Sequence, residues 1–233
     1  MALYAIADLH LSLTADKPMD AFPGWQDYVA RLQRNWSRLV DPEDTVVIGG
    51  DISWGMSLEE AAADFAFLDR LPGRKLLLKG NHDYWWATRR KMDDFFAANG
   101  WNSLHILHND AYDAGDGMAV CGTRGWFYDA EADADKKILA REVGRLRASV
   151  AAARKLGREP VAFLHYPPVY AGAVCDEILG ALHEEGIRRC YYGHIHGAGI
   201  RKAYRGGYEG IALELIAADA LSFTPLFIPP SSV

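Results

Sequence analysis

The stretch ALYAIADLH, residues 2–10, shows the pattern that decides this fold, because a short apolar run ends in an Asp-x-His pair. The apolar residues 2–7 predict a buried strand. The pattern recurs four times along the chain, in TVVIGGD at 45–51, KLLLKGNHD at 75–83, VAFLH at 161–165 and CYYGHIH at 190–196. Each run predicts a further buried strand that ends in Asp, Asn or His.

Helical patterns separate most of these strands. We predict helices over residues 25–40, from Ser57 onward, and over 86–99, 133–156 and 178–185, with a capping box from Ser57 to Glu60. Short strands are expected at 104–107 and 118–121, and antiparallel hairpins between 199 and 228. In an open α/β sheet the carboxyl ends of the strands gather on one edge, where ligands bind. The five polar clusters are therefore expected to converge in one pocket.

The donors in these clusters are oxygen and nitrogen atoms, with no thiolate among them. Such a set suits Mn, Fe, Ni or Zn. In the Asp-x-His and His-x-His pairs, both side chains can turn to one side where the strand gives way to a loop. Gly50, Gly80 and Gly193 each precede a candidate ligand, and a residue without Cβ allows the backbone to come close to a metal cluster.

Composition narrows the class of protein. The chain has 233 residues, 50% of them hydrophobic, and a formal net charge of -6. This length suits one domain over residues 1–233, and the absence of a basic run argues against a stable nucleic-acid complex. Three widely spaced cysteines, no basic leader and no apolar run of membrane-spanning length predict a cytoplasmic protein without a membrane partner.

The ordered motifs resemble those of the calcineurin-like metallophosphoesterases, whose pattern is D-x-H, G-D, G-N-H-D/E, a lone H and G-H-x-H. The matching positions are Asp8 and His10, Gly50 and Asp51, residues 80–83, His165, and residues 193–196. The resemblance spans residues 8–196, and all five motifs appear in the family's order. It implies an α/β fold, a four-layer αββα sandwich of two mixed β-sheets with helices on both outer faces.

The resemblance also implies a binuclear centre that holds two divalent metal ions. The first would be bound by Asp8, His10, Asp51 and His196, and the second by Asp51, Asn81, His165 and His194, with Asp51 as the bridge. Two cations about 3.5–4 Å apart can share a water and hold it as hydroxide, which would attack phosphorus in line. The metals would offset the charge that builds on the phosphoryl oxygens.

By the same resemblance, His82 is the general acid that protonates the leaving alkoxide. Asp83 is expected to hydrogen-bond the His82 imidazole and to favour its charged form. Arg124 lies between glycines after a predicted strand, and two interpretations stay open: it holds a substrate phosphate, or it pins a loop through a salt bridge. The other three histidines, His105, His108 and His183, are expected to be structural or exposed.

The leading interpretation is hydrolysis of phosphomonoesters or phosphodiesters. The substrate classes that stay open are small nucleotides, sugar- or lipid-linked pyrophosphates and phosphoproteins, of which the first suits a compact cytoplasmic chain. A nuclease that needs a capping domain is disfavoured. A catalytically silent, metal-binding scaffold is the alternative from another class, and it is disfavoured because every motif position is filled. The natural substrate, the metal and the oligomeric state are left open.

Overall fold

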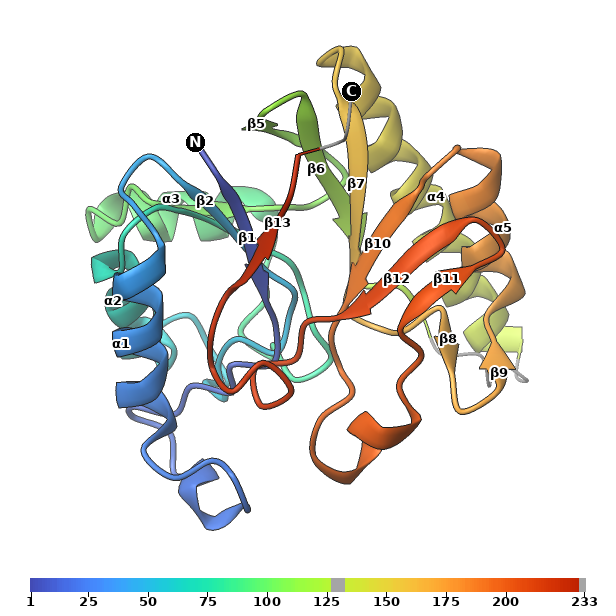
Figure 1. The fold of residues 1–233 in the computed structure, drawn as a ribbon. Coiled ribbons are helices and arrows are strands. Elements are labelled where there is room, and N and C mark those ends of the chain that lie inside the picture. The colour runs from blue at the N-terminus through green and yellow to red at the C-terminus, as the bar shows by residue number, and fades with distance from the viewer. Residues whose placement is uncertain (127–132, 231–233) are drawn as a thin grey trace.

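Two β-sheets pack face to face in the computed structural model of the protein, which describes residues 1–126 and 133–230. The first sheet has the strand order β13-β1-β2-β3-β4. Its strands are β1 (Leu3–Ile6), β2 (Thr45–Ile48), β3 (Arg74–Leu77), β4 (Leu104–Ile106) and β13 (Leu226–Ile228). Strands β1 to β4 are parallel and β13 is antiparallel to β1, so the sheet is mixed (Figure 1).

The second sheet has the strand order β11-β12-β10-β7-β6-β5. Its strands are β5 (Tyr112–Gly115), β6 (Met118–Thr123), β7 (Glu159–Leu164), β10 (Arg189–Tyr192), β11 (Gly206–Tyr208) and β12 (Ile211–Leu215). The central strands β6, β7, β10 and β12 are parallel, and β5 and β11 run antiparallel at the two edges. A separate hairpin joins β8 (Val169–Tyr170) to β9 (Ala173–Val174).

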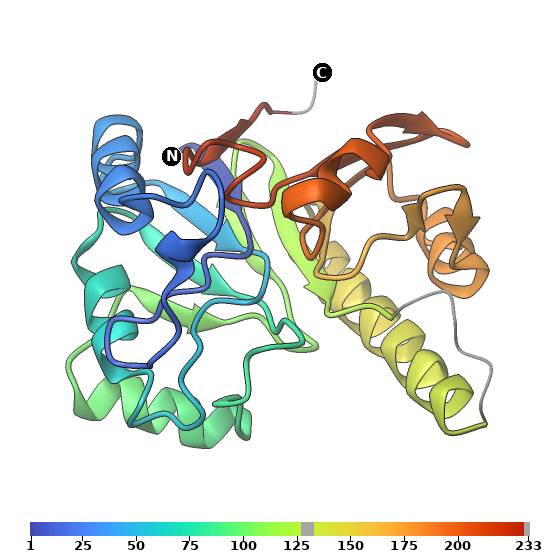
Figure 2. The same cartoon turned by 90° about the horizontal axis from the view of Figure 1, so that it is seen from below.

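Helices cover the outer face of each sheet (Figure 2). The first sheet is covered by α1 (Tyr28–Leu39), α2 (Ala62–Arg70) and α3 (Arg89–Ala98), and the second by α4 (Asp133–Lys155) and α5 (Asp176–Glu184). Two 3-10 helices, η1 (Met19–Ala21) and η2 (Gly197–Lys202), lie in loops. The expected four-layer αββα sandwich is therefore confirmed.

Side chains alternate between the two faces of each sheet, and this alternation explains the layers. In β2 the side chain of Val47 packs between the two sheets, whereas Val46 and Ile48 pack against the helices of the first sheet. In β7, likewise, Phe163 packs between the sheets and Ala162 packs toward the helices of the second sheet. Because neighbouring side chains point to opposite faces, a strand between two layers must be apolar at every position. This is why the predicted strands are continuous apolar runs.

Two expectations about individual elements were wrong. The capping hydrogen bond from Glu60 N to Ser57 Oγ forms, but the segment after Ser57 makes turns and α2 begins at Ala62. Gly55 packs against the start of this helix, and an added Cβ there would lie 2.6 Å from Ala61 N. In the tail, β11 and β12 form the expected hairpin, but β12 also pairs parallel with β10 and β13 crosses to the first sheet. The strand β5 and the β8–β9 hairpin had no clear sequence signal.

None of the described helices is long and apolar enough to cross a membrane.

Candidate metal centre

The predicted ligands all lie in loops after parallel strands. Asp8 and His10 follow β1, Asp51 follows β2, Asn81 follows β3, His165 follows β7, and His194 and His196 follow β10. The two sheets meet at this end, where Ala7 N donates to Ile216 O at 2.7 Å and Ala218 N donates to Ala7 O at 2.8 Å. The carboxyl ends of both sheets therefore share one edge, as predicted (Figure 1).

The backbone of this edge is strained. Asp8, His10, Asp51 and His194 have positive φ angles of 56°, 46°, 51° and 68°. Asp and His enter the left-handed region more readily than most residues, although such conformations cost about 1–3 kcal/mol each and concentrate at functional sites. The sharp turns bring residues two positions apart, such as Asp8 and His10, into one cluster.

The glycines before the ligands allow the loops to pack closely. An added Cβ would collide with a candidate ligand at each of them. The distances would be 2.6 Å from Gly50 to His165 Nδ1, 2.1 Å from Gly80 to Asp51 Oδ1, and 2.8 Å from Gly193 to Asp8 Oδ2. The close approach predicted for these glycines is thus confirmed.

Asp51 lies at the centre of the cluster, and its two carboxylate oxygens face different histidines. Its Oδ2 lies 3.7 Å from His10 Nε2, and its Oδ1 lies 3.5 Å from His165 Nε2. Two groups of side chains have donor atoms within 4.8 Å of one another: Asp8, His10 and Asp51, and Asp51, His165 and His194. Asp51 belongs to both groups, so the two groups share one carboxylate.

Asn81 belongs with the second group. Its Oδ1 lies 2.8 Å from His165 Nε2 and 2.8 Å from His194 Nδ1. His165 Nδ1 lies 3.1 Å from the carbonyl oxygen of Gly49, which can only accept, so the proton of the neutral ring belongs on Nδ1. His165 Nε2 then presents a lone pair to an oxygen that is itself an acceptor. A cation between them would turn two opposed lone pairs into two ligands.

The first group also contains an imidazole nitrogen that lacks a suitable hydrogen-bond partner. His10 Nε2 is buried and has no hydrogen-bond partner among the residues that the structure describes. Buried polar atoms are nearly always paired, and an exception calls for an explanation such as a bound ion. With Asp51 Oδ2 at 3.7 Å, the ring is held with a nitrogen aimed at the cluster. The residues of both groups therefore fit divalent cations.

Burial sets the protonation of the cluster. It raises the pKa of Asp8 well above its usual range, aided by the charge of Asp51, whose own pKa is also raised by burial. Burial lowers the pKa of both His165 and His194 to about 3 and that of His10 well below its usual range. Neutral imidazoles are the form that binds metals, and two cations would offset the mutual repulsion of the buried carboxylates.

His196 lies beside the first group but belongs to neither. Its exposed side chain is edge-on to the His10 ring, with ring centroids 5.2 Å apart. The loop that follows is anchored by Gly197 N, which donates to Asp219 Oδ2 at 2.6 Å. The role of His196 as a ligand remains a prediction.

His82 stands next to the cluster without joining either group. Its backbone N–H donates to Asp51 Oδ1 at 2.8 Å, and its ring packs against Trp54 with centroids 4.6 Å apart. His82 Nδ1 is buried and has no hydrogen-bond partner in the part of the chain that the structure describes. His82, Trp54 and Tyr84 line a groove of about 730 Å³ that leads away from the cluster.

The expectation for Asp83 was wrong. It does not hydrogen-bond the His82 imidazole, because its carboxylate is fully engaged by other donors. These are the backbone N–H groups of Asp51, Ile52, Ser53 and Gly80, at 2.7–3.4 Å, and Trp85 Nε1 at 3.0 Å. Burial and the charge of Asp51 raise the pKa of Asp83 to about 7, whereas the N–H donors favour its charged form. Asp83 therefore ties the loop after β2 to the loop after β3.

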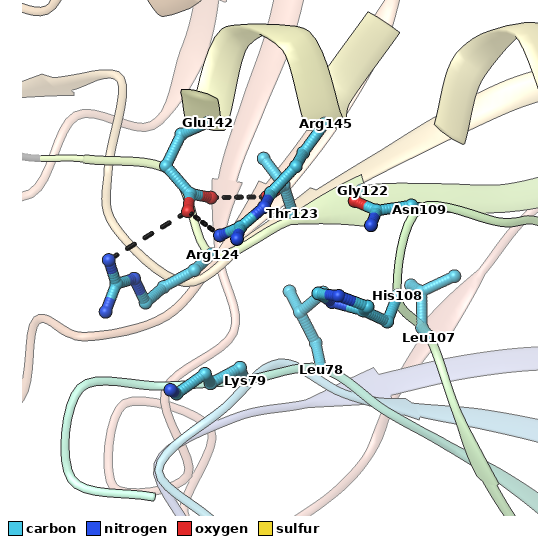
Figure 3. Close-up of a pocket in the computed structure, with 10 residues that line it drawn as sticks. All are labelled: Leu78, Lys79, Leu107, His108, Asn109, Gly122, Thr123, Arg124, Glu142 and Arg145. Carbon is cyan, nitrogen blue, oxygen red and sulfur yellow. Dashed lines mark hydrogen bonds and ion pairs between the residues drawn. The ribbon is translucent and has the colours of Figure 1, made fainter. Parts of the chain in front are cut away.

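Arg124 lies at the end of the second sheet that borders the cluster. Its carbonyl oxygen accepts hydrogen bonds from His165 N at 3.1 Å and Tyr166 N at 2.9 Å. Its guanidinium lies 3.9 Å from the Glu142 carboxylate (Figure 3). It also lies 5.0 Å from the centroid of the Trp126 ring. The salt bridge of one interpretation is thus present but loose. The guanidinium also lines a small pocket, as the other interpretation requires.

Sequence reasoning missed the other cations of this pocket. Lys79 and Arg145 line it together with Arg124 (Figure 3). The position of Lys79, directly before the Gly-Asn-His-Asp motif, was a signal that could have been used. Arg145 lies within helix α4, and nothing in the local sequence shows which of the arginines in that helix faces the pocket.

The family model described as calcineurin-like phosphoesterase matches residues 1–198. A search of curated proteins found no match.

Several solved structures share the fold. A protein of unknown function, AQ665 from Aquifex aeolicus, is 15% identical with a TM-score of 0.53, and the match covers 97% of this chain and 95% of that one. Phosphopantetheinyl hydrolase (PptH) from Mycobacterium tuberculosis is 15% identical with a TM-score of 0.54, over 99% and 96% of the two chains. Purple acid phosphatase PPD1 from yellow lupin is 10% identical with a TM-score of 0.50, over 100% of this chain and 46% of that one.

Proposed function

Because this chain belongs to the calcineurin-like phosphoesterase family, we propose that it hydrolyses phosphomonoesters or phosphodiesters at a centre of two divalent cations. The observation that carries the proposal is the position of Asp51, which belongs to both groups of candidate ligands. Its two oxygens face His10 and His165 separately, an arrangement that suits a bridging carboxylate.

The first cation would be held by the group that contains Asp8, His10 and Asp51, and His196 would complete it. The second would be held by Asp51, Asn81, His165 and His194. When bound, the cations supply Lewis-acid charge that lowers the pKa of a water and offsets the negative charge on the phosphoryl oxygens. The ion identities that we propose are Mn, Fe, Ni or Zn, since the donors are oxygens and imidazoles.

His82 is the general acid of the proposed reaction. It lies within one residue of Asn81 and lines the groove of about 730 Å³, which is where a leaving group could extend from the cluster. Its ring packs against Trp54 and is thereby held in place. A protonated His82 could donate to the leaving oxygen, a role typically worth about 10²–10⁴ in rate. Asp83 supports this step indirectly, because it fixes the loop that carries His82.

Arg124 is proposed to bind a phosphate of the substrate. A guanidinium offers two parallel donors to phosphate oxygens. The loose contact of 3.9 Å to Glu142 leaves its donors available, and its backbone bond to His165 N keeps it beside the second cation group.

A catalytically silent scaffold and a phosphoprotein phosphatase are the competing functions. A scaffold would not need an imidazole beside the ligands, and His82 has one there with a buried, unpaired nitrogen. A phosphoprotein phosphatase would act on a protein surface, whereas a small phosphorylated substrate such as a nucleotide suits the grooves of about 670 and 730 Å³ that flank the cluster. We therefore favour a small substrate, with no stable nucleic-acid partner and no membrane partner.

The cytoplasm is the proposed location. All three cysteines are buried and unpaired, which is typical of proteins in reducing compartments.

The proposed activity is tested with the Mn²⁺-loaded protein on bis(p-nitrophenyl) phosphate and p-nitrophenyl phosphate, together with a screen of nucleotides, phosphosugars, phosphopantetheinyl diesters and phosphopeptides. We expect turnover that depends on Mn²⁺ and falls at least 100-fold in Asp51→Asn. The matched control is His183→Ala, an exposed histidine paired with Glu209, which should retain full activity. Tight Mn²⁺ binding without turnover of any substrate would overturn the proposal and favour the scaffold.

A further inference from the structure

A second polar pocket opens beside the metal centre, between the carboxyl ends of β3 and β6 and helix α4 (Figure 3). None of the residues that line it is a candidate metal ligand. Its volume is about 80 Å³, whereas pockets that hold a whole small molecule measure about 300–1,000 Å³. The pocket therefore fits one compact group of a larger ligand.

The charge of this pocket is positive. Lys79, Arg124 and Arg145 contribute three cationic groups, and Glu142 contributes one carboxylate. That carboxylate is buried and already engaged, because Arg145 donates to it at 2.5 Å and Thr123 Oγ1 donates to it at 2.5 Å. One negative charge cannot neutralise three positive ones, so about two positive charges remain uncompensated.

Two of the cations have donors to spare. Arg124 Nε is buried and has no hydrogen-bond partner among the described residues, and the contact of Arg124 with Glu142 at 3.9 Å is longer than a hydrogen bond. Lys79 is half-buried, and the positive charges of Arg124 and Arg145 act on its ammonium together with the negative charges of Asp83 and Glu142. Figure 3 shows the head groups of Lys79 and Arg124 extending toward the same side of the pocket. Partly buried cations with unpaired donors are costly unless an anion completes them.

The pocket adjoins the second cation group through the backbone. Lys79 precedes Asn81 by two residues, and the carbonyl oxygen of Arg124 accepts the backbone hydrogen bond of His165 at 3.1 Å. One substrate molecule could therefore reach both the cations and this pocket.

We propose that Lys79, Arg124 and Arg145 form a subsite for a second phosphoryl group, so that the preferred substrate carries a phosphate besides the one that is hydrolysed. This inference rests on the proposed function and names its substrate class. A phosphoryl group matches the subsite because it brings up to two negative charges and three acceptor oxygens in a small volume. Arginine donors bind such groups bidentately, and a lysine acts as a point charge.

The test compares matched nucleotides on the Mn²⁺-loaded protein by isothermal titration calorimetry. Adenosine 5′-monophosphate is compared with adenosine 5′-diphosphate and with adenosine 3′,5′-bisphosphate. We expect at least one of the two-phosphate nucleotides to bind at least tenfold more tightly than the monophosphate. Lys79→Met and Arg145→Gln should each remove most of this advantage while they keep the metal content of the wild type, and Lys79→Met should also keep its melting temperature.

The matched control is Arg147→Gln. Arg147 lies in the same helix α4 but pairs with Glu184 outside the pocket, so its removal should leave the advantage intact. Lys79→Met keeps the test decisive if Arg145→Gln does not fold, because Lys79 makes no ion pair within the described residues. Equal affinity for all three nucleotides, or an advantage that survives Lys79→Met, would overturn the subsite. Absence of hydrolysis by the wild type would instead overturn the proposed function, since the calorimetric comparison does not depend on turnover.

Discussion

Gly80→Ala tests how closely the loops of the metal centre must pack. A Cβ at this position would lie 2.1 Å from Asp51 Oδ1 and 2.2 Å from Asp51 N, about 1.3 Å closer than the 3.4 Å of an ordinary contact. The φ angle of Gly80 is not positive, so alanine brings no conformational strain of its own. The shared carboxylate of Asp51 must therefore move by about 1 Å, a displacement that can cost about 100-fold in rate.

We expect Gly80→Ala to bind Mn²⁺ at least tenfold more weakly, to lose about 100-fold in kcat/KM on bis(p-nitrophenyl) phosphate, and to be less stable by about 1–3 kcal/mol from overpacking. Calorimetry, hydrolysis assays and thermal unfolding measure the three effects. Gly180→Ala in helix α5 is the matched control, because nothing lies within 4 Å of its added Cβ. It should keep full activity and gain about 0.5–1 kcal/mol. Wild-type metal affinity and activity in Gly80→Ala would refute the close packing described here.

Four further predictions concern other parts of the molecule. His82→Ala should lose about 10²–10⁴ in kcat while retaining its metal, as metal analysis of the purified variant would show; loss of metal would mean that His82 is a ligand. Asp83→Asn should lower the free energy of unfolding by about 3 kcal/mol or more, measured in urea, because an amide cannot accept all five N–H groups and places its own NH₂ against some of them. Chelation of the metals should lower the melting temperature by about 5–10 °C, since metal at 100 times its Kd contributes about 2.7 kcal/mol; an unchanged melting temperature would argue against structural coupling of the cations. Lys75→Met should destabilise the fold by about 2–4 kcal/mol without changing kcat/KM, because the buried ammonium donates to three backbone carbonyls at 2.5–3.3 Å. The control is Lys155→Met at an exposed position, which should change the free energy of unfolding by less than about 0.5 kcal/mol.

The pattern of apolar runs was enough to predict the buried strands and the edge that carries the candidate site, whereas the four-layer sandwich was predicted from the resemblance to a family. Strands such as β2 lie between two apolar layers, so they are apolar at every position and stand out along the chain. The polar residue directly after each strand is then easy to recognise, because it ends a continuous apolar run. Since parallel strands end at one edge, Asp51 and His165 could be placed together although 114 positions separate them.

Contacts between side chains of separate loops could not be predicted in this way. By the resemblance, Asp83 was expected to hydrogen-bond the His82 imidazole, but its carboxylate accepts from the backbone N–H groups of Asp51 and Gly80 instead. The pocket cations were hidden for a related reason. Arg145 reaches the pocket through the packing of α4 against β6, and the local sequence contains no record of that tertiary contact.

The paired-cation centre is tested most directly by anomalous diffraction from crystals of the protein grown with Mn²⁺. We predict two manganese peaks, one among Asp8, His10 and Asp51 and the other among Asp51, Asn81, His165 and His194. Asp51 should bind both cations, either through one shared oxygen or through one oxygen each. A single peak, or two peaks that do not share Asp51, would contradict this account.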